Sequence, residues 1–148
     1  MKILSAIGGG LAGATALTLL HETNKKYSSE APRMDLLGMS ALAKILRSTG
    51  NRVPDDKKLY KQALAGDILT NLVFYSIAGI GNTRSVWQKG ALLGLAAGIS
   101  ALVLPGPLGL DEDHSAKTSK TKITTMALYL VGGLVASAVI TMFNKKRR

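Results

Sequence analysis

The chain has 148 residues, a formal net charge of +10 at pH 7 and no cysteine. This length predicts a single domain, and the lack of cysteine excludes disulfides, thiolate nucleophiles and sulfur-ligated metals within it. The basic residues lie almost entirely between apolar blocks, which indicates contact with anionic lipid headgroups and argues against a nucleic-acid partner.

Four stretches are apolar for about the length that a helix needs to cross a bilayer. They cover residues 3–20, 63–81, 86–104 and 123–143. The first follows Lys2 and also fits a signal peptide, but it is long, rich in glycine and lacks a convincing cleavage site. We therefore expect it to be a retained helix. The predicted fold is an all-α membrane protein with four transmembrane helices in an antiparallel bundle.

The connection between the first two stretches contains a shorter amphipathic segment, residues 34–48. At 100° per residue its polar side chains, including Lys44 and Arg47, share one narrow stripe, and apolar residues occupy most of the rest. The segment is too short to span a bilayer. It is predicted either to lie in the membrane interface, with Lys44 and Arg47 on anionic headgroups, or to pack over the mouth of the bundle.

The second stretch carries polar residues at the expected depth of the membrane. Asp67 and Asn71 are four positions apart and share one helical face, with Thr70 beside them. An ionisable residue at this depth is costly and usually faces protein, water or a partner group. Two interpretations therefore stay open: Asp67 lines a solute pathway, or it forms a structural ion pair with Lys61 or Arg33.

Small residues recur every four positions in the other three stretches. This spacing lets helix backbones approach closely where no hydrophobic effect operates between helices. The contacts can be within one chain or between copies, and because four spans are too few to enclose a wide pathway, we expect a homo-oligomer. The residues predicted to pack in this way are Gly9, Gly13, Gly90, Gly94, Gly98, Gly132 and Gly133.

Four basic residues follow the last apolar stretch and are predicted to contact lipid headgroups: Lys145, Lys146, Arg147 and Arg148. Four spans place both termini on the same side of the membrane, and this basic cluster resists translocation. We expect a bacterial inner (plasma) membrane with cytoplasmic termini, although the loops on the opposite side contain more basic residues and favour the reverse orientation.

The same topology brings several polar residues to the loop end of the bundle. His21 and Glu22 end the first stretch, Arg33 and Asp35 begin the amphipathic segment, and Asp67 enters the second stretch from this end. They are predicted to form a cluster at the mouth, although His21 and Glu22 can equally be hydrated residues at the interface. No metal-ligand spacing or cofactor motif is present, so neither a metal nor a cofactor is expected.

Three functions from different classes fit these residues. The first is a channel or transporter for a small solute or ion, with Asp67 and Asn71 on the route. The second is a non-catalytic scaffold, accessory subunit or anionic-lipid-binding protein. The third is an enzyme acting on lipid headgroups, with His21 or Glu22 as acid or base. We place permeation slightly ahead of scaffolding and expect no catalytic residue.

Overall fold

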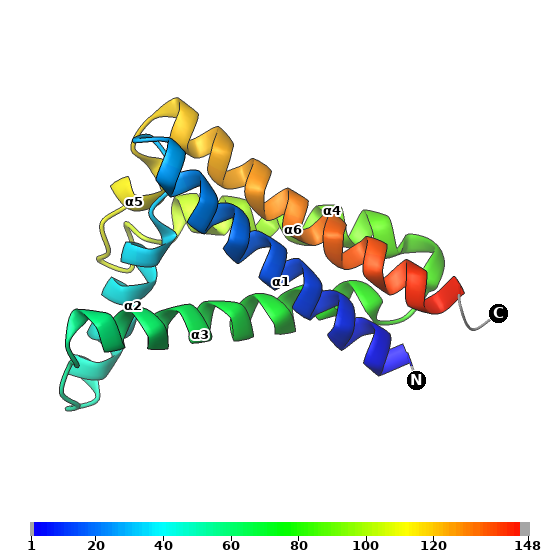
Figure 1. Cartoon of the computed structure of the whole chain (residues 1–148), viewed down its shortest axis with the longest axis horizontal. Helices are drawn as coiled ribbons and strands as arrows, with labels where there is room; N and C mark the ends of the chain where they lie inside the picture. Colours follow the sequence, from blue (N-terminus) through cyan, green and yellow to red (C-terminus); the bar gives the residue numbers. More distant parts are fainter. Residues whose placement is uncertain (1, 146–148) are drawn as a thin grey trace.

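The computed structural model describes residues 2–145, and every regular element among them is a helix (Figure 1). The predicted all-α class is therefore confirmed. In chain order the elements of residues 2–145 are α1 (Lys2–Tyr27), α2 (Met34–Ser48), α3 (Asp56–Ser76), the short 3₁₀ turns η1 (Ile77–Gly79) and η2 (Thr83–Ser85), α4 (Val86–Val103), α5 (Asp113–Ala116) and α6 (Ser119–Lys145).

Three helices are long and apolar enough to cross a membrane: Ile3–Tyr27 of α1, Val86–Val103 and Ser119–Lys145. They correspond to the first, third and fourth apolar stretches. Two of them extend beyond the predicted limits, because hydropathy marks the edge of the bilayer and not the end of a helix. Their length and composition are compatible with a small helical membrane protein.

The second predicted span, residues 63–81, does not join these three in the part of the chain that the structure describes. The helix there, α3, begins at Asp56, where the Asp55 carboxylate accepts a hydrogen bond of 3.1 Å from the amide of Lys58. Its first turns are basic, and because the helix already ends at Ser76, its apolar part is short. The prediction of four spans is therefore not confirmed by length and composition.

The helix predicted at residues 34–48 is present with the same bounds as α2. It ends before Gly50, whose φ of 73° a glycine adopts without strain. Leu37 and Ala43 are buried, and α2 contacts α3 and α5. The amide of Arg33, just before α2, donates a hydrogen bond of 2.7 Å to the carbonyl of His114. The helix thus packs over one end of the bundle.

The three long apolar helices form the body of the molecule. α6 packs between α1 and α4 and runs antiparallel to both, and α3 packs against α1 (Figure 1). The start of α1 and the end of α6 lie at the same end of the molecule, whereas α2 and α5 lie at the opposite end. The loop end identified from the sequence is therefore the end where the first and third connections meet.

Glycines allow the helix backbones to approach closely within one chain. A β-carbon placed on Gly133 of α6 would lie 2.1 Å from the carbonyl oxygen of Gly90 on α4. One placed on Gly13 of α1 would lie 2.5 Å from the carbonyl oxygen of Gly132. Gly9 faces Ile140 in the same way, Gly94 faces Leu130 and Gly98 faces Met126. All seven predicted packing glycines are thus in contact between helices of the same chain.

Buried hydroxyl groups join the helices through backbone carbonyls. The Tyr75 hydroxyl of α3 donates to the carbonyl of Tyr129 on α6 at 2.8 Å, and Ser137 of α6 donates to that of Val86 on α4 at 3.0 Å. In the third connection, Ser115 donates to Ala101 at 2.6 Å. These bonds satisfy polar groups that would otherwise be unpaired inside the protein, and Tyr75 fixes the position of α3 against the body.

The outer surface of the bundle is apolar on all four long helices. Large exposed side chains include Leu11 and Leu19 on α1, Leu92 and Ile99 on α4, and Met142 on α6. On α3 they include Leu69 and Val73, which are 61% and 64% exposed. Large exposed apolar side chains on every long helix are unusual for a soluble monomer. The second half of α3 therefore presents the same kind of outer face as the three helices with spanning length.

Candidate functional site

Three members of the predicted mouth cluster form a chain of ion pairs with Lys25. The ammonium of Lys25 lies 2.7 Å from a carboxylate oxygen of Glu22 and 3.2 Å from one of Asp35. The Arg33 guanidinium binds the same carboxylate of Asp35, at 2.8 Å. Lys25 was not among the predicted cluster residues, although it lies three positions after Glu22 on α1, where such pairs form. The ion pairs join the end of α1 to the start of α2.

Asp35 is the most strongly perturbed carboxylate of this cluster. Its side chain is only 8% exposed, and burial by itself would raise its pKa. Hydrogen bonds from Arg33 and Lys25 outweigh burial and lower the pKa of Asp35 to about 2. The same bond raises the pKa of Arg33. Both groups therefore stay charged at neutral pH, and we assign this part of the cluster a structural role.

Replacing Asp35 by asparagine is expected to lower the free energy of unfolding by ~1–2 kcal/mol at neutral pH. Because the pKa of Asp35 is lower in the folded chain than in the unfolded one, its contribution is present above about pH 4 and is lost as the pH falls toward about 2. Unfolding titrations in detergent at several pH values measure this difference. The exposed Asp113→Asn variant is the control, and an Asp35→Asn effect that persists unchanged below pH 2 contradicts the assignment.

His21 forms none of these ion pairs and is buried between helices. The residue is 7% exposed, and its ring meets that of Tyr129 edge to face, with 5.6 Å between the ring centroids. Both ring nitrogens are buried and have no hydrogen-bond partner in the described residues, and the same holds for the hydroxyl oxygen of Thr18 one turn earlier. Thr18 was not predicted as a site residue, although its spacing of three from His21 places both on one face of α1.

Asp67 has no ion-pair partner among residues 2–145. One of its carboxylate oxygens accepts a hydrogen bond of 3.0 Å from the side-chain amide of Asn71, which also donates to the Asp67 carbonyl. Thr70 donates back to the carbonyl of Gly66 in its own helix. The sequence left open an ion pair of Asp67 with Lys61 or Arg33. The structure shows neither pair.

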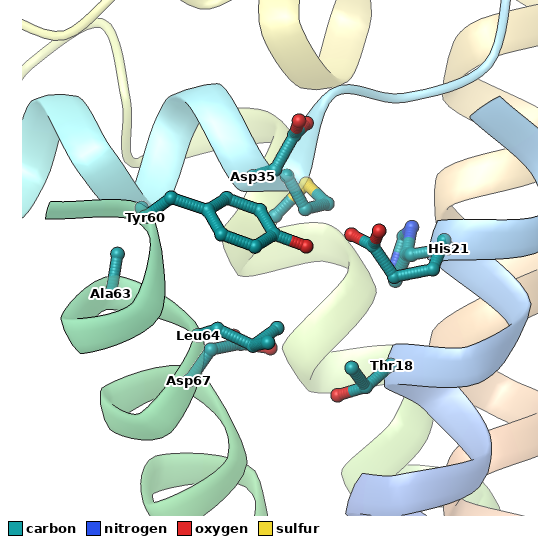
Figure 2. A pocket seen from close by; sticks show the side chains of 10 residues that line it. Thr18, His21, Asp35, Tyr60, Ala63, Leu64 and Asp67 are labelled. Atoms are coloured by element: carbon teal, nitrogen blue, oxygen red, sulfur yellow. The ribbon is translucent and has the colours of Figure 1, made fainter. Parts of the chain in front are cut away.

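The polar groups of α1 and α3 face each other across a small cavity of ≈ 30 Å³ (Figure 2). Thr18 and His21 line one wall, Tyr60 and Asp67 of α3 line the other, and Asp35 of α2 lies at its edge. Tyr60 was not predicted either; Lys25 lies 5.2 Å from the centre of its ring. A cavity of this size can hold about one water molecule.

A second, larger hollow, which Asp67 also lines, lies between α2, α3 and α4. Its volume is ≈ 450 Å³, and its lining is mainly apolar. Asp67, Thr70 and Asn71 contribute polar groups from α3, and Ser100 contributes one from α4. Asp67 thus lines both hollows. Among residues 2–145, no three His, Asp or Glu side chains gather to hold a metal ion.

The residues predicted to contact headgroups have different environments. The Lys44 ammonium donates a hydrogen bond to the carbonyl of Leu108, so it is already engaged within the chain. Arg47, at the end of α2, and Lys145, at the end of α6, are exposed. Lys146, Arg147 and Arg148 lie outside the described residues.

No family model, curated protein or solved structure matches this chain. Its function must therefore be inferred from the site itself, since a helical bundle alone supports many functions.

Proposed function

We propose that this protein is a small membrane protein that lets a small solute or ion pass, with Asp67 on the route. The observation that carries the proposal is the position of Asp67 between two hollows, without a counter-charge among the described residues. An unpaired carboxylate is costly inside a membrane protein. It is best explained by an exchangeable cation, a proton or a polar solute that visits it.

The proposal requires α3 to enter the membrane, although its length and composition alone do not establish this. Two features support it. Leu69 and Val73 point outward as exposed apolar side chains, whereas Asn71 and Tyr75 are buried against the bundle. The lysines of α3 lie in its first turns, at the loop end, where long basic side chains can reach the headgroups. The second half of α3 then completes a bundle of four membrane-embedded helices.

Self-association belongs to this proposal, because a cavity of ≈ 30 Å³ in one chain is narrow for any solute larger than water. The glycines are already in contact within the chain. A homo-oligomer would therefore use the outer apolar faces of the helices instead.

Binding of anionic headgroups is the second candidate function. It rests on α2, where Arg47 and the large apolar residue Ile45 are both exposed. Exposed basic and apolar side chains on one short helix suit a membrane interface. The enzyme alternative has less support, because Glu22 and Arg33 are both held in ion pairs.

We expect Asp67→Asn to lower flux through the protein by at least about tenfold, because amide for carboxylate removes both the charge and the proton-binding group. The measurement compares proteoliposomes for proton, potassium and urea permeability, with size-exclusion profiles to show that assembly is unchanged. Asp113→Asn makes the same chemical change at an exposed position of α5 and should leave every flux at the wild-type level.

Two outcomes count against the proposal. One is a wild-type protein that makes liposomes no more permeable to any probe than protein-free vesicles are. The other is a measurable flux that Asp67→Asn leaves unchanged, which removes Asp67 from the route.

A further inference from the structure

Two residues that line the cavity between α1, α2 and α3 have buried polar atoms that no described residue satisfies. These atoms are both ring nitrogens of His21 and the hydroxyl oxygen of Thr18. Buried polar groups are almost always hydrogen-bonded to protein or to ordered water. A neutral imidazole has one donor and one acceptor nitrogen, and a hydroxyl both donates and accepts. An occupant of this cavity must therefore be able to donate and to accept hydrogen bonds.

The size of the cavity limits what this occupant can be. At ≈ 30 Å³ it holds about one water molecule and no hydrated sodium or potassium ion or organic solute. Water can hydrogen-bond to one imidazole nitrogen, as donor or as acceptor, and also to the Thr18 hydroxyl. The wall opposite His21 carries Asp67 (Figure 2), so an imidazole and a carboxylate line the same water-sized cavity.

Asp67 differs from the other carboxylates around this cavity. The titratable groups that surround His21 are Glu22 and Lys25 on α1, Asp35 on α2, Tyr60 and Asp67 on α3, and Tyr129 on α6. Glu22 and Asp35 both bind Lys25, and Asp35 also binds Arg33. Among the described residues, Asp67 is the carboxylate of this cavity that no cation neutralises, and Asn71 donates to one of its two oxygens.

We propose that His21, Thr18 and Asp67 form a proton pathway through this cavity, with one bound water between the imidazole and the carboxylate. This inference rests on the proposed function and names its permeant as the proton. His21 takes a proton from the loop end and becomes imidazolium. The water accepts that proton on its oxygen and gives one of its own to the Asp67 carboxylate. Neutral imidazole, carboxylic acid and an unchanged water remain, so one proton has moved.

The second hollow provides the exit. Asp67 also lines the space of ≈ 450 Å³ between α3 and α4, where Thr70, Asn71 and Ser100 contribute polar groups. The proton on Asp67 is released to this side, which restores the carboxylate for the next transfer. Thr18 orients the water, because its hydroxyl lies on the same face of α1 as His21.

The test uses the full chain in liposomes that contain a pH-sensitive dye, with a potassium gradient and valinomycin to drive protons inward. His21→Gln keeps a polar side chain but cannot carry a proton, and it is expected to lower proton flux by at least about tenfold. His114→Gln is the matched control, since His114 is the second histidine of the chain and lies in α5, away from this cavity. Its flux should remain within about twofold of wild type.

Two further measurements keep the test decisive if His21→Gln folds poorly. Thr18→Val removes the hydroxyl with little change in volume and should lower proton flux severalfold. Wild-type flux should also fall in heavy water, an effect that a purely structural role does not produce. Potassium flux, measured without valinomycin, should stay at the level of protein-free vesicles in every variant.

The outcomes separate this inference from the proposed function. Proton flux that His21→Gln and Thr18→Val leave unchanged overturns the pathway. Potassium or urea flux that depends on Asp67, without proton flux, leaves the proposed function standing and refutes the proton as its permeant. No flux of any probe above protein-free vesicles refutes both.

Discussion

Replacing Gly133 by alanine is expected to lower the free energy of unfolding by about 3 kcal/mol, the upper end of what overpacking usually costs. The added β-carbon would lie 2.1 Å from the carbonyl oxygen of Gly90 and 3.2 Å from the amide nitrogen of Gly94. These are backbone atoms of α4, so no side-chain rotation can relieve the clash. α4 and α6 must separate, which also disturbs the 3.0 Å hydrogen bond from Ser137 to Val86.

The measurement is an unfolding titration in mixed micelles with an increasing fraction of denaturing detergent, followed by circular dichroism. Gly66→Ala is the matched control, because a β-carbon at Gly66 of α3 would have no atom within 4 Å. That variant is expected to gain up to ~1 kcal/mol from helix propensity. A Gly133→Ala protein as stable as wild type contradicts the close α4–α6 packing.

Tyr75→Ala is expected to have the largest effect of any single truncation on α3, ~3–5 kcal/mol, as for other large buried aromatic residues. Tyr75 is completely buried, and its hydroxyl donates to the Tyr129 carbonyl at 2.8 Å. Its ring fills the space that Gly132 and Gly13 leave open. The truncation removes the ring and the hydrogen bond that joins α3 to the Tyr129 carbonyl of α6.

Tyr75→Phe separates the two contributions, since it keeps the ring and should cost only ~0.5–1.5 kcal/mol. Tyr27→Ala, at a residue that is 84% exposed, is expected to stay within about 0.5 kcal/mol of wild type. The same titration measures all three variants. Equal effects for Tyr75→Ala and Tyr27→Ala would show that α3 is not docked on α6 as described.

The helices could be predicted from the sequence, because the spacing of apolar residues and the residues that end a helix are both local features of the chain. The bounds of α2 agree with the prediction, since Gly50 follows the helix with a positive φ that glycine readily adopts. The limits of the apolar helices were less accurate. α1 continues to Tyr27, beyond residue 20, and α6 begins at Ser119, before residue 123. A hydropathy profile does not detect polar turns that extend a helix out of the bilayer.

The second span shows where hydropathy is insufficient. Residues 63–81 form an apolar run, but the helix there begins at Asp56 and ends at Ser76, so its apolar part is shared between α3 and the turn η1. Where the chain turns depends on packing: a β-carbon on Gly79 would lie 2.5 Å from the β-carbon of Ala6 on α1. Such a contact between distant residues cannot be read from a local pattern.

The candidate site was predictable as a neighbourhood but not as a set of bonds. The topology brings His21, Glu22, Arg33, Asp35 and Asp67 to one end. The structure places four of them around one cavity, whereas Arg33 does not line it and instead pairs with Asp35. The partners were not predictable, because they depend on how α2 crosses that end. Lys25 was not predicted as part of the site, although it pairs with Glu22 and Asp35, the other carboxylates of the cavity.

The account depends most on α3 carrying Asp67 into the membrane, and labelling of single cysteines tests this directly, because the chain has no cysteine of its own. Lys57→Cys, Val73→Cys and Leu92→Cys are reconstituted separately and treated with a membrane-impermeant maleimide on both sides. We predict rapid labelling at position 57 and protection at positions 73 and 92, since both of these side chains are exposed and apolar. Labelling at position 73 as fast as at position 57, with position 92 protected, would place α3 outside the membrane and contradict the account.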